Sequence, residues 1–359
     1  MLINHSNFDK INVLEELSSN VVDDVAFSYD LVSSAMKRRD AVDHGIKMPW
    51  SKMDQFLMRP GEFILYGGYS GHRKSQSLAQ MMLHAAAQGF RVGIMSLEVP
   101  VEATFDMLAG MSAVVARPPE SYLKEFAQWS DDRIFLYERQ DSISPAAALQ
   151  ACIGLRKFMG ADVVVIDGMM CVDLDDDLSQ QHRFAAALAA IAKKYNMTII
   201  LVHHSRKPQG HDGGNRMPDA HSFLGTSRLV NLASSVCIVF DNKKKAAQIE
   251  RGDEVSDDEP DYLIKVAKHR NGKWEGIVGL YHHPTARILC NNRQRQYRPI
   301  EIRKANREEY EHGDKATGRG HGQAGQSDPF SGFGDIDDGP LVRLGGRVSA
   351  DTVGVEGSP

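Results

Sequence analysis

Short apolar runs alternate with helix-like segments through the middle of this 359-residue chain. Each run is typical of a strand buried on both faces, and most runs are followed by a segment with helical spacing of apolar residues. The strands are predicted at 61–68, 90–98, 132–138, 161–168 and 197–204, and the helices at 75–89, 101–114, 144–160 and 183–196. This order predicts an α/β fold with a doubly wound, mostly parallel sheet and helices on both faces. Later strands at 233–241, 261–272 and 274–283 extend the sheet and could pair antiparallel at one edge.

The composition divides the chain into three zones. Residues 1–45 are polar with a helical pattern, residues 46–303 hold the apolar runs, and residues 304–359 are rich in Gly, Asp and Ser. The last zone is predicted to be a disordered tail, because it has too little apolar surface to order itself. The whole chain is 42% hydrophobic and 25% charged, which excludes a collagen, a coiled coil and a wholly disordered protein.

The sequence indicates neither a membrane protein nor a disulfide-stabilised one. The apolar runs are far shorter than a bilayer requires, and the first residues carry no secretory signal, so we expect a cytoplasmic location and no membrane partner. The four cysteines (Cys152, Cys171, Cys237 and Cys290) form no CxxC pair, so no disulfide framework or zinc site is expected. The net charge of -5 gives no nucleic-acid signal by itself, although a local basic patch would suffice.

A glycine-rich turn, GGYSGHRKS at 67–75, follows the first predicted strand. From Gly68 onward it matches the phosphate-binding pattern GxxxxGK[ST] between a strand and a helix, except that Arg73 stands where the pattern has glycine. Lys74 would contact the β- and γ-phosphates and Ser75 would bind Mg²⁺. An arginine before the lysine fits only with its side chain turned away, and it could add a charge near the nucleotide. The alternative is a structural turn with an incidental lysine. The residues predicted to bind the nucleotide are Gly68, Gly71, His72, Arg73, Lys74, Ser75 and Gln76.

Polar residues end three more of the predicted strands. Asp167 ends VVVID and is expected to hold Mg²⁺. Glu98 ends the strand after the first helix, where a carboxylate could orient or deprotonate an attacking water. His203 and His204 end TIILVHH, and we expect the first to be buried and the second to be the polar one. The alternatives are that Asp167 only caps the next segment and that Glu98 is a surface residue.

In this order and spacing, these blocks resemble the DnaB-like hexameric replicative helicases, and more closely the helicase half of phage primase-helicases. The resemblance covers roughly residues 20–300 and includes the segments IKMPWSKMDQFLMRPGEFILYGG, SFLGTSRLVNLASSVCIVFD and VAKHRNGKWEG. It implies a RecA-like ATPase that hydrolyses ATP or another NTP with Mg²⁺ at the interfaces of a homo-oligomeric ring, a hexamer in this family. If a phage encodes the chain, the cytoplasm is that of the host cell. The segment SFLGTS departs from the family's DLRGSG form.

The resemblance also implies roles for individual residues. Glu98 matches the catalytic glutamate, and His204 matches the γ-phosphate sensor. Arg270 matches the arginine finger that enters the neighbouring subunit's site, with Lys268 beside it; the alternative is a solvated basic strand end. Residues 27–42 match the linker helix that packs on the next subunit. The alternative is a simple N-terminal helix that packs on its own domain.

Single-stranded DNA would bind to loops that line the ring's channel. The loop at 205–223 carries Arg206, Lys207 and Arg216, which would follow phosphates without reading bases. The loop after Asp167 is acidic, so DNA contact is placed mainly on 205–216. The tail, with Phe330 and Phe333 among acidic residues, could dock a replicative polymerase or a primase. The alternatives are an ordinary surface loop and an inert tail.

Three functions fit this sequence. The first is a ring-shaped replicative helicase that couples NTP hydrolysis to translocation and duplex unwinding. The second is a RecA-like, DNA-stimulated ATPase without helicase activity, such as a recombination mediator or a helicase loader. The third is a structural ring in which Arg73 blocks turnover.

Overall fold

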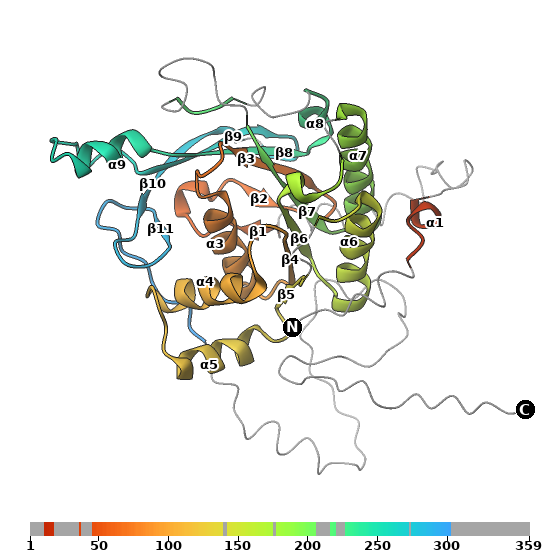
Figure 1. The fold of residues 1–359 in the computed structure, drawn as a ribbon, viewed down its shortest axis with the longest axis horizontal. Helices are drawn as coiled ribbons and strands as arrows, with labels where there is room; N and C mark the ends of the chain where they lie inside the picture. The colour runs from red at the N-terminus through yellow and green to blue at the C-terminus, as the bar shows by residue number, and fades with distance from the viewer. Residues whose placement is uncertain are drawn as a thin grey trace, which may run out of the picture.

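The computed structural model describes residues 11–17, 36, 45–138, 142–174, 177–205, 216–219, 227–272 and 274–302. In this part of the chain a nine-stranded sheet runs in the order β11-β10-β9-β8-β3-β7-β6-β4-β5 (Figure 1). Its parallel strands are β3 (Phe63–Gly68), β4 (Val92–Ser96), β5 (Ile134–Leu136), β6 (Val163–Asp167), β7 (Thr198–His204) and β8 (Ser235–Asp241). The antiparallel edge contains β9 (Tyr262–His269), β10 (Gly276–His282) and β11 (Leu289–Cys290). The predicted α/β fold is thus confirmed, together with its antiparallel edge.

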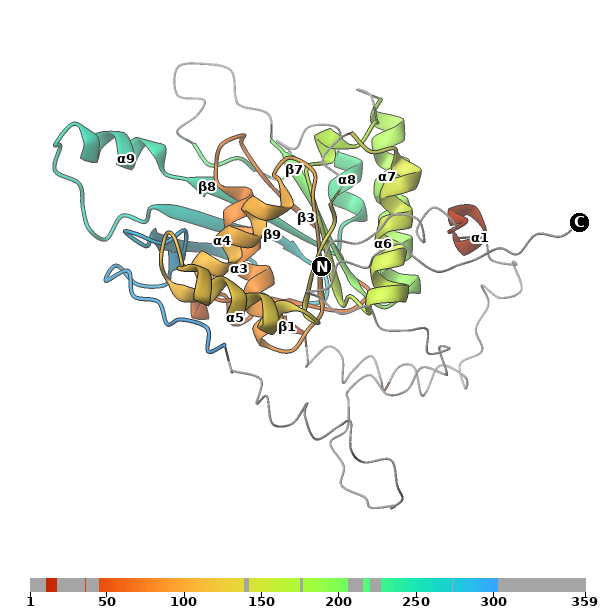
Figure 2. The ribbon, with the colours of Figure 1, turned by 60° about the horizontal axis from the view of Figure 1, so that its bottom comes forward.

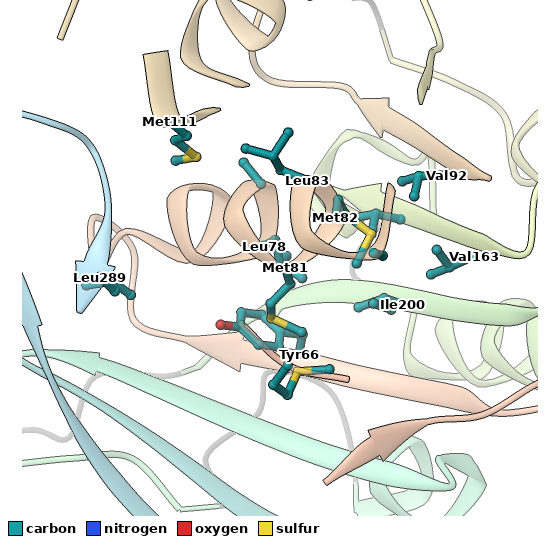
Figure 3. Close-up of a cluster of buried hydrophobic side chains, with 14 of the residues drawn as sticks. Tyr66, Leu78, Met81, Met82, Leu83, Val92, Met111, Val163, Ile200 and Leu289 are labelled. Carbon is teal, nitrogen blue, oxygen red and sulfur yellow. The ribbon is translucent and has the colours of Figure 1, made fainter. Parts of the chain in front are cut away.

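Helices cover both faces of the sheet. Figure 2 shows α3 (Lys74–Ala87), α4 (Val101–Ala113) and α5 (Glu120–Ser130) on one side and α6 (Pro145–Met159), α7 (Leu178–Lys194) and α8 (Ser227–Leu232) on the other. Each side has its own apolar cluster. In the first cluster, Leu78 and Met81 of α3 lie toward the ring of Tyr66 on β3 (Figure 3). The apolar strands are therefore buried between two helical layers, as their near-continuous hydrophobicity predicts.

Local signals explain where several elements begin and end. Ser144 accepts a hydrogen bond from the Ala147 N–H at the start of α6, and Pro145 occupies its first turn, as the sequence predicts. The strands β4 and β6 are shorter than predicted, so Glu98 lies two residues beyond β4. Smaller elements are α1 (Val13–Leu17), β1 (Ile46–Lys47), β2 (Leu57–Met58), α9 (Lys243–Glu250) and two 3₁₀ turns, Ser51–Met53 and Met169–Cys171.

Two of the predicted segments fall largely or wholly outside the described residues. These are the linker helix at 27–42, of which only Met36 is described, and the tail at 304–359. Within the described ranges, no helix is both long enough and apolar enough to cross a bilayer.

Candidate nucleotide site

The carboxyl ends of four parallel strands bring the predicted site residues to one edge of the sheet. In the register of the sheet, Gly68 at the end of β3 pairs with His204 at the end of β7, and Ser96 of β4 pairs with Asp167 of β6. The turn at 67–75, called the phosphate loop below, leaves this edge and enters α3 at Lys74. Ligands of open α/β sheets bind at this edge.

The phosphate loop has the backbone shape that such a turn needs. Gly71 has a φ of +73° and Arg73 a φ of +53°, so the chain twice enters the left-handed region before α3 begins. Among the described residues, no side chain caps the first turn of α3. Its backbone N–H groups are therefore available to an anion, and the helix dipole favours negative charge there.

Gly68 is required by a close approach of β8. A Cβ at this position would overlap the carbonyl oxygen of Val239, which is backbone and cannot easily move. We therefore expect Gly68→Ala to destabilise the fold by about 1–3 kcal/mol, the usual cost of overpacking. Thermal or urea unfolding measures this change. Gly93→Ala on β4 is the matched control, because the added methyl meets only side-chain atoms, of Leu155 at 2.9 Å and Val164 at 3.1 Å, which can shift where a backbone carbonyl cannot. An equal or larger loss in the control would contradict the account.

Lys74 is held against the loop that it would serve. Its side chain is buried, and Nζ donates to the carbonyl oxygens of Tyr69 at 3.1 Å and Gly68 at 3.4 Å. Nζ also donates to Nδ1 of His204 at 3.1 Å. Burial lowers the pKa of Lys74, while the charges of Asp167 and Glu98 act to raise it. The ammonium group thus lies between the loop backbone and the two carboxylates.

Asp167 and Ser75 meet beside the lysine. The Ser75 hydroxyl lies close enough to the Asp167 carboxylate to lower its pKa. Burial raises the pKa of Asp167 and nearby Glu98 raises it further, whereas Ser75 and Lys74 lower it. A half-buried carboxylate next to a hydroxyl suits a Mg²⁺ ion whose other ligands would be phosphates and water. No group of three or more His, Cys, Asp or Glu residues suited to a metal occurs in the described ranges. Asp167 and Ser75 alone would supply two oxygen ligands, and a bound nucleotide and water would have to supply the others.

Glu98 lies across a glycine from Asp167. At Gly168, whose φ is +114°, a Cβ would lie 3.3 Å from Oε1 of Glu98 and 3.4 Å from Sγ of Cys171. Oε1 also lies 3.7 Å from Nε2 of His204. The side chain of Glu98 is 46% exposed, so water can reach it. This position suits a carboxylate that orients or deprotonates water.

The two histidines at the end of β7 divide as expected. His203 is 1% exposed, whereas His204 is partly exposed and faces the site. Because an ammonium group can only donate, Nδ1 of His204 must accept from Lys74, which leaves the ring neutral with its proton on Nε2. Burial lowers the pKa of His204, the charge of Lys74 lowers it further, and Glu98 opposes both.

Three predicted nucleotide-binding side chains lie away from this cluster or make no described contact with it. Arg73 pairs with Asp241 at the end of β8, with Nε 3.1 Å from Oδ2. His72 is buried, and its Nδ1 accepts the backbone N–H of Asp241. Gln76 is half-buried in the first turn of α3. For these three residues, contact with a nucleotide stays a prediction, and it would be made by their backbone N–H groups.

Arg270 and Lys268 lie at the opposite end of the strands from the phosphate loop. β9 runs antiparallel to β8, so that His269 pairs with Ser235 while Tyr262 pairs with Asp241. Arg270 is therefore separated from its own phosphate loop by the length of β8, roughly 20 Å for a strand of this size. Both side chains cap α8: Nη2 of Arg270 donates to the Asn231 carbonyl at 2.9 Å, and Nζ of Lys268 donates to the Val230 carbonyl at 2.6 Å.

Of the predicted DNA-binding residues, Arg206 and Lys207 lie outside the described residues. Arg216 is exposed, and its charge lowers the pKa of Tyr69, whereas burial and Asp219 raise it. The charges of Arg216 and Asp219 thus act on a residue of the phosphate loop. Two residues that the phosphate-binding pattern does not specify also contact the loop's side chains: the Tyr69 carbonyl accepts from Lys74, and Asp241 pairs with Arg73. Asp241 ends a buried strand as Asp167 does, and that signal could have found it.

Sequence and structure comparisons fit this geometry. Residues 40–210 match the family model of an AAA domain, and no curated protein matches the chain. A solved structure described as an ATPase domain is similar with a TM-score of 0.61 at 15% identity, covering 75% of this chain and 99% of that one. A DnaB-like replicative helicase, described with its interactions with primase, has a TM-score of 0.58 at 15% identity, covering 78% of this chain and 70% of that one. Residues 40–210 are thus similar in sequence to an AAA domain, and the fold resembles those of the ATPase domain and the DnaB-like helicase named above.

Proposed function

We propose that this protein is a ring-forming replicative DNA helicase that couples hydrolysis of Mg-NTP to movement along single-stranded DNA. The observation that carries the proposal is that the proposed catalytic groups are divided between the two ends of the parallel strands. Lys74, Glu98 and Asp167 gather at one end, while Arg270 lies at the other. A site completed by a neighbouring copy requires such a division.

The chain's own residues would prepare hydrolysis as follows. The loop N–H groups and Lys74 would bind the phosphates, and Asp167 with Ser75 would hold Mg²⁺, which would supply positive charge to the phosphate oxygens. Glu98 takes a proton from, or orients, the water that attacks the γ-phosphate. His204 links Lys74 to Glu98, so a change at the phosphate can reach β7 and the loop that follows it. That loop would move the DNA strand.

The contact between His204 and Lys74 predicts a pH dependence. The neutral ring accepts from Lys74, and protonation would place a proton and a positive charge against the ammonium group. The lowered pKa of His204 means that activity should fall only below the ordinary histidine value of about 6.5. A pH–rate profile measures this acid limb, which should move to lower pH in His204→Gln. His84→Gln is the control, because that histidine also has a pKa lowered by burial but lies at the far end of α3. An identical acid limb in all three proteins would contradict the prediction.

A forked-DNA unwinding assay with Mg-ATP tests the helicase proposal. Wild type should separate the strands, and Lys74→Ala should not. Hydrolysis that responds to DNA without strand separation would instead favour the second candidate, a recombination mediator or a helicase loader. The observation that favours this candidate is the absence of the DLRGSG form in SFLGTS. The contact of Arg73 with Asp241 argues against the third candidate, because the side chain is directed to β8.

The partners of the proposed helicase are single-stranded DNA, further copies of the chain, and a primase or polymerase that binds the 304–359 tail. One of the similar solved structures is described with its interactions with primase, which supports testing a primase first. Binding of the isolated 304–359 peptide to primase measures this partner directly.

A further inference from the structure

Arg73 occupies a backbone conformation that suits glycine. The phosphate-binding pattern has glycine before its lysine, and here an arginine has a φ of +53° and a ψ of +34°. Side chains with a Cβ are disfavoured in this left-handed region, and glycine is not. Something else in the protein must therefore hold the turn.

Asp241 makes contacts that can do so. Its Oδ2 accepts from Nε of Arg73 at 3.1 Å, and its backbone N–H donates to Nδ1 of His72 at 3.0 Å. One residue at the end of β8 thus binds two consecutive residues of the phosphate loop. The tyrosine opposite it on β9, Tyr262, donates to the Arg73 carbonyl oxygen at 3.4 Å.

The carboxylate of Asp241 is itself fixed. Its side chain is 11% exposed, and Oδ1 lies 2.8 Å from Nε2 of His282 on β10. An exposed ion pair contributes little on its own, and the Arg73 side chain is 51% exposed. The Asp241 carboxylate is buried and pairs with two partners, Arg73 and His282, so its position is fixed by the sheet. The Arg73 side chain must therefore extend to it.

We propose that Asp241 is a positioning residue of the nucleotide site, which replaces the missing glycine by holding Arg73 in the left-handed turn and its guanidinium toward β8. This inference rests on the proposed nucleotide site. Without the carboxylate, the loop would lose the turn that aims its N–H groups. The freed guanidinium, one residue before Lys74, would then be available to the phosphate position. Both effects weaken productive nucleotide binding more than they alter the chemical step.

A double-mutant cycle in the full chain tests the proposal. The Kd for a fluorescent ATP analogue and the KM and kcat of ATP hydrolysis are measured for wild type, Asp241→Ala, Arg73→Gly and the double variant. Asp241→Ala should raise Kd and KM about tenfold, the scale of one charge-assisted hydrogen bond, with kcat nearly unchanged. In the Arg73→Gly background the same change should have almost no effect, because glycine adopts the turn unaided.

Two further variants keep the test decisive. Asp241→Asn has the same shape and can still accept from Arg73, so it should fold and raise KM less than alanine does. Asp253→Ala removes the exposed partner of Arg251 and should change nothing. Equal effects of Asp241→Ala in both backgrounds, or no effect in either, would overturn the inference while leaving nucleotide binding intact. A wild-type protein that binds no nucleotide would overturn the proposed function and this inference together.

Discussion

Replacing Arg270 with alanine is expected to lower NTP hydrolysis by the assembled protein about 10³–10⁵-fold, the contribution of an arginine finger. The physical reason is the position of Arg270 at the end of the strands opposite its own phosphate loop. Its Nη2 donates to the Asn231 carbonyl of α8, and the side chain is exposed, so it can reach the site of a neighbouring copy. Steady-state hydrolysis measures the loss, and Arg251→Ala, which removes an exposed arginine, should leave the rate unchanged.

Mixing experiments decide whether Arg270 acts between subunits. Excess Arg270→Ala should reduce the activity of wild type by more than simple dilution. A mixture of inactive Arg270→Ala and inactive Lys74→Ala should recover some activity, because certain interfaces then combine an intact lysine with an intact arginine. A linear dilution curve without any recovery would contradict action in trans.

Replacing Glu98 with glutamine is expected to slow hydrolysis about 10²–10⁴-fold, the range for a general base. Nucleotide binding should persist, because Lys74, Ser75 and the loop are unchanged. The measurement is kcat together with the Kd for ATP, and Glu102→Gln, an exposed glutamate four residues along the chain, is the matched control. Full activity in Glu98→Gln would show that another group activates the water.

The sequence predicts those parts of the site that depend on strand ends. Lys74, Glu98, Asp167 and His204 each follow an apolar run, and parallel strands must bring their ends to one edge. The same logic cannot place Arg270, because its distance from the phosphate loop depends on β9 running antiparallel to β8. The apolar pattern of a strand late in the chain does not indicate whether that strand runs parallel or antiparallel to its neighbour.

The contacts of Arg73 show a second limit. A motif identifies the residue that departs from it, but the compensating residue lies 168 positions away in the sequence, and only the folded sheet brings Asp241 to the loop. Helix α9 shows a third limit, because KKKAAQIE buries only Lys245 and so has no apolar face to detect. By contrast, α5 has Leu123, Phe126 and Trp129 at helical spacing, and this pattern could have predicted it.

The rate of Mg-dependent ATP hydrolysis by wild type, with and without single-stranded DNA, tests the central claim most directly. A motor whose DNA-binding loop follows β7 should hydrolyse ATP faster when DNA occupies that loop, since His204 joins β7 to Lys74. We therefore expect clear stimulation that disappears without Mg²⁺. A turnover rate that does not respond to DNA would contradict it.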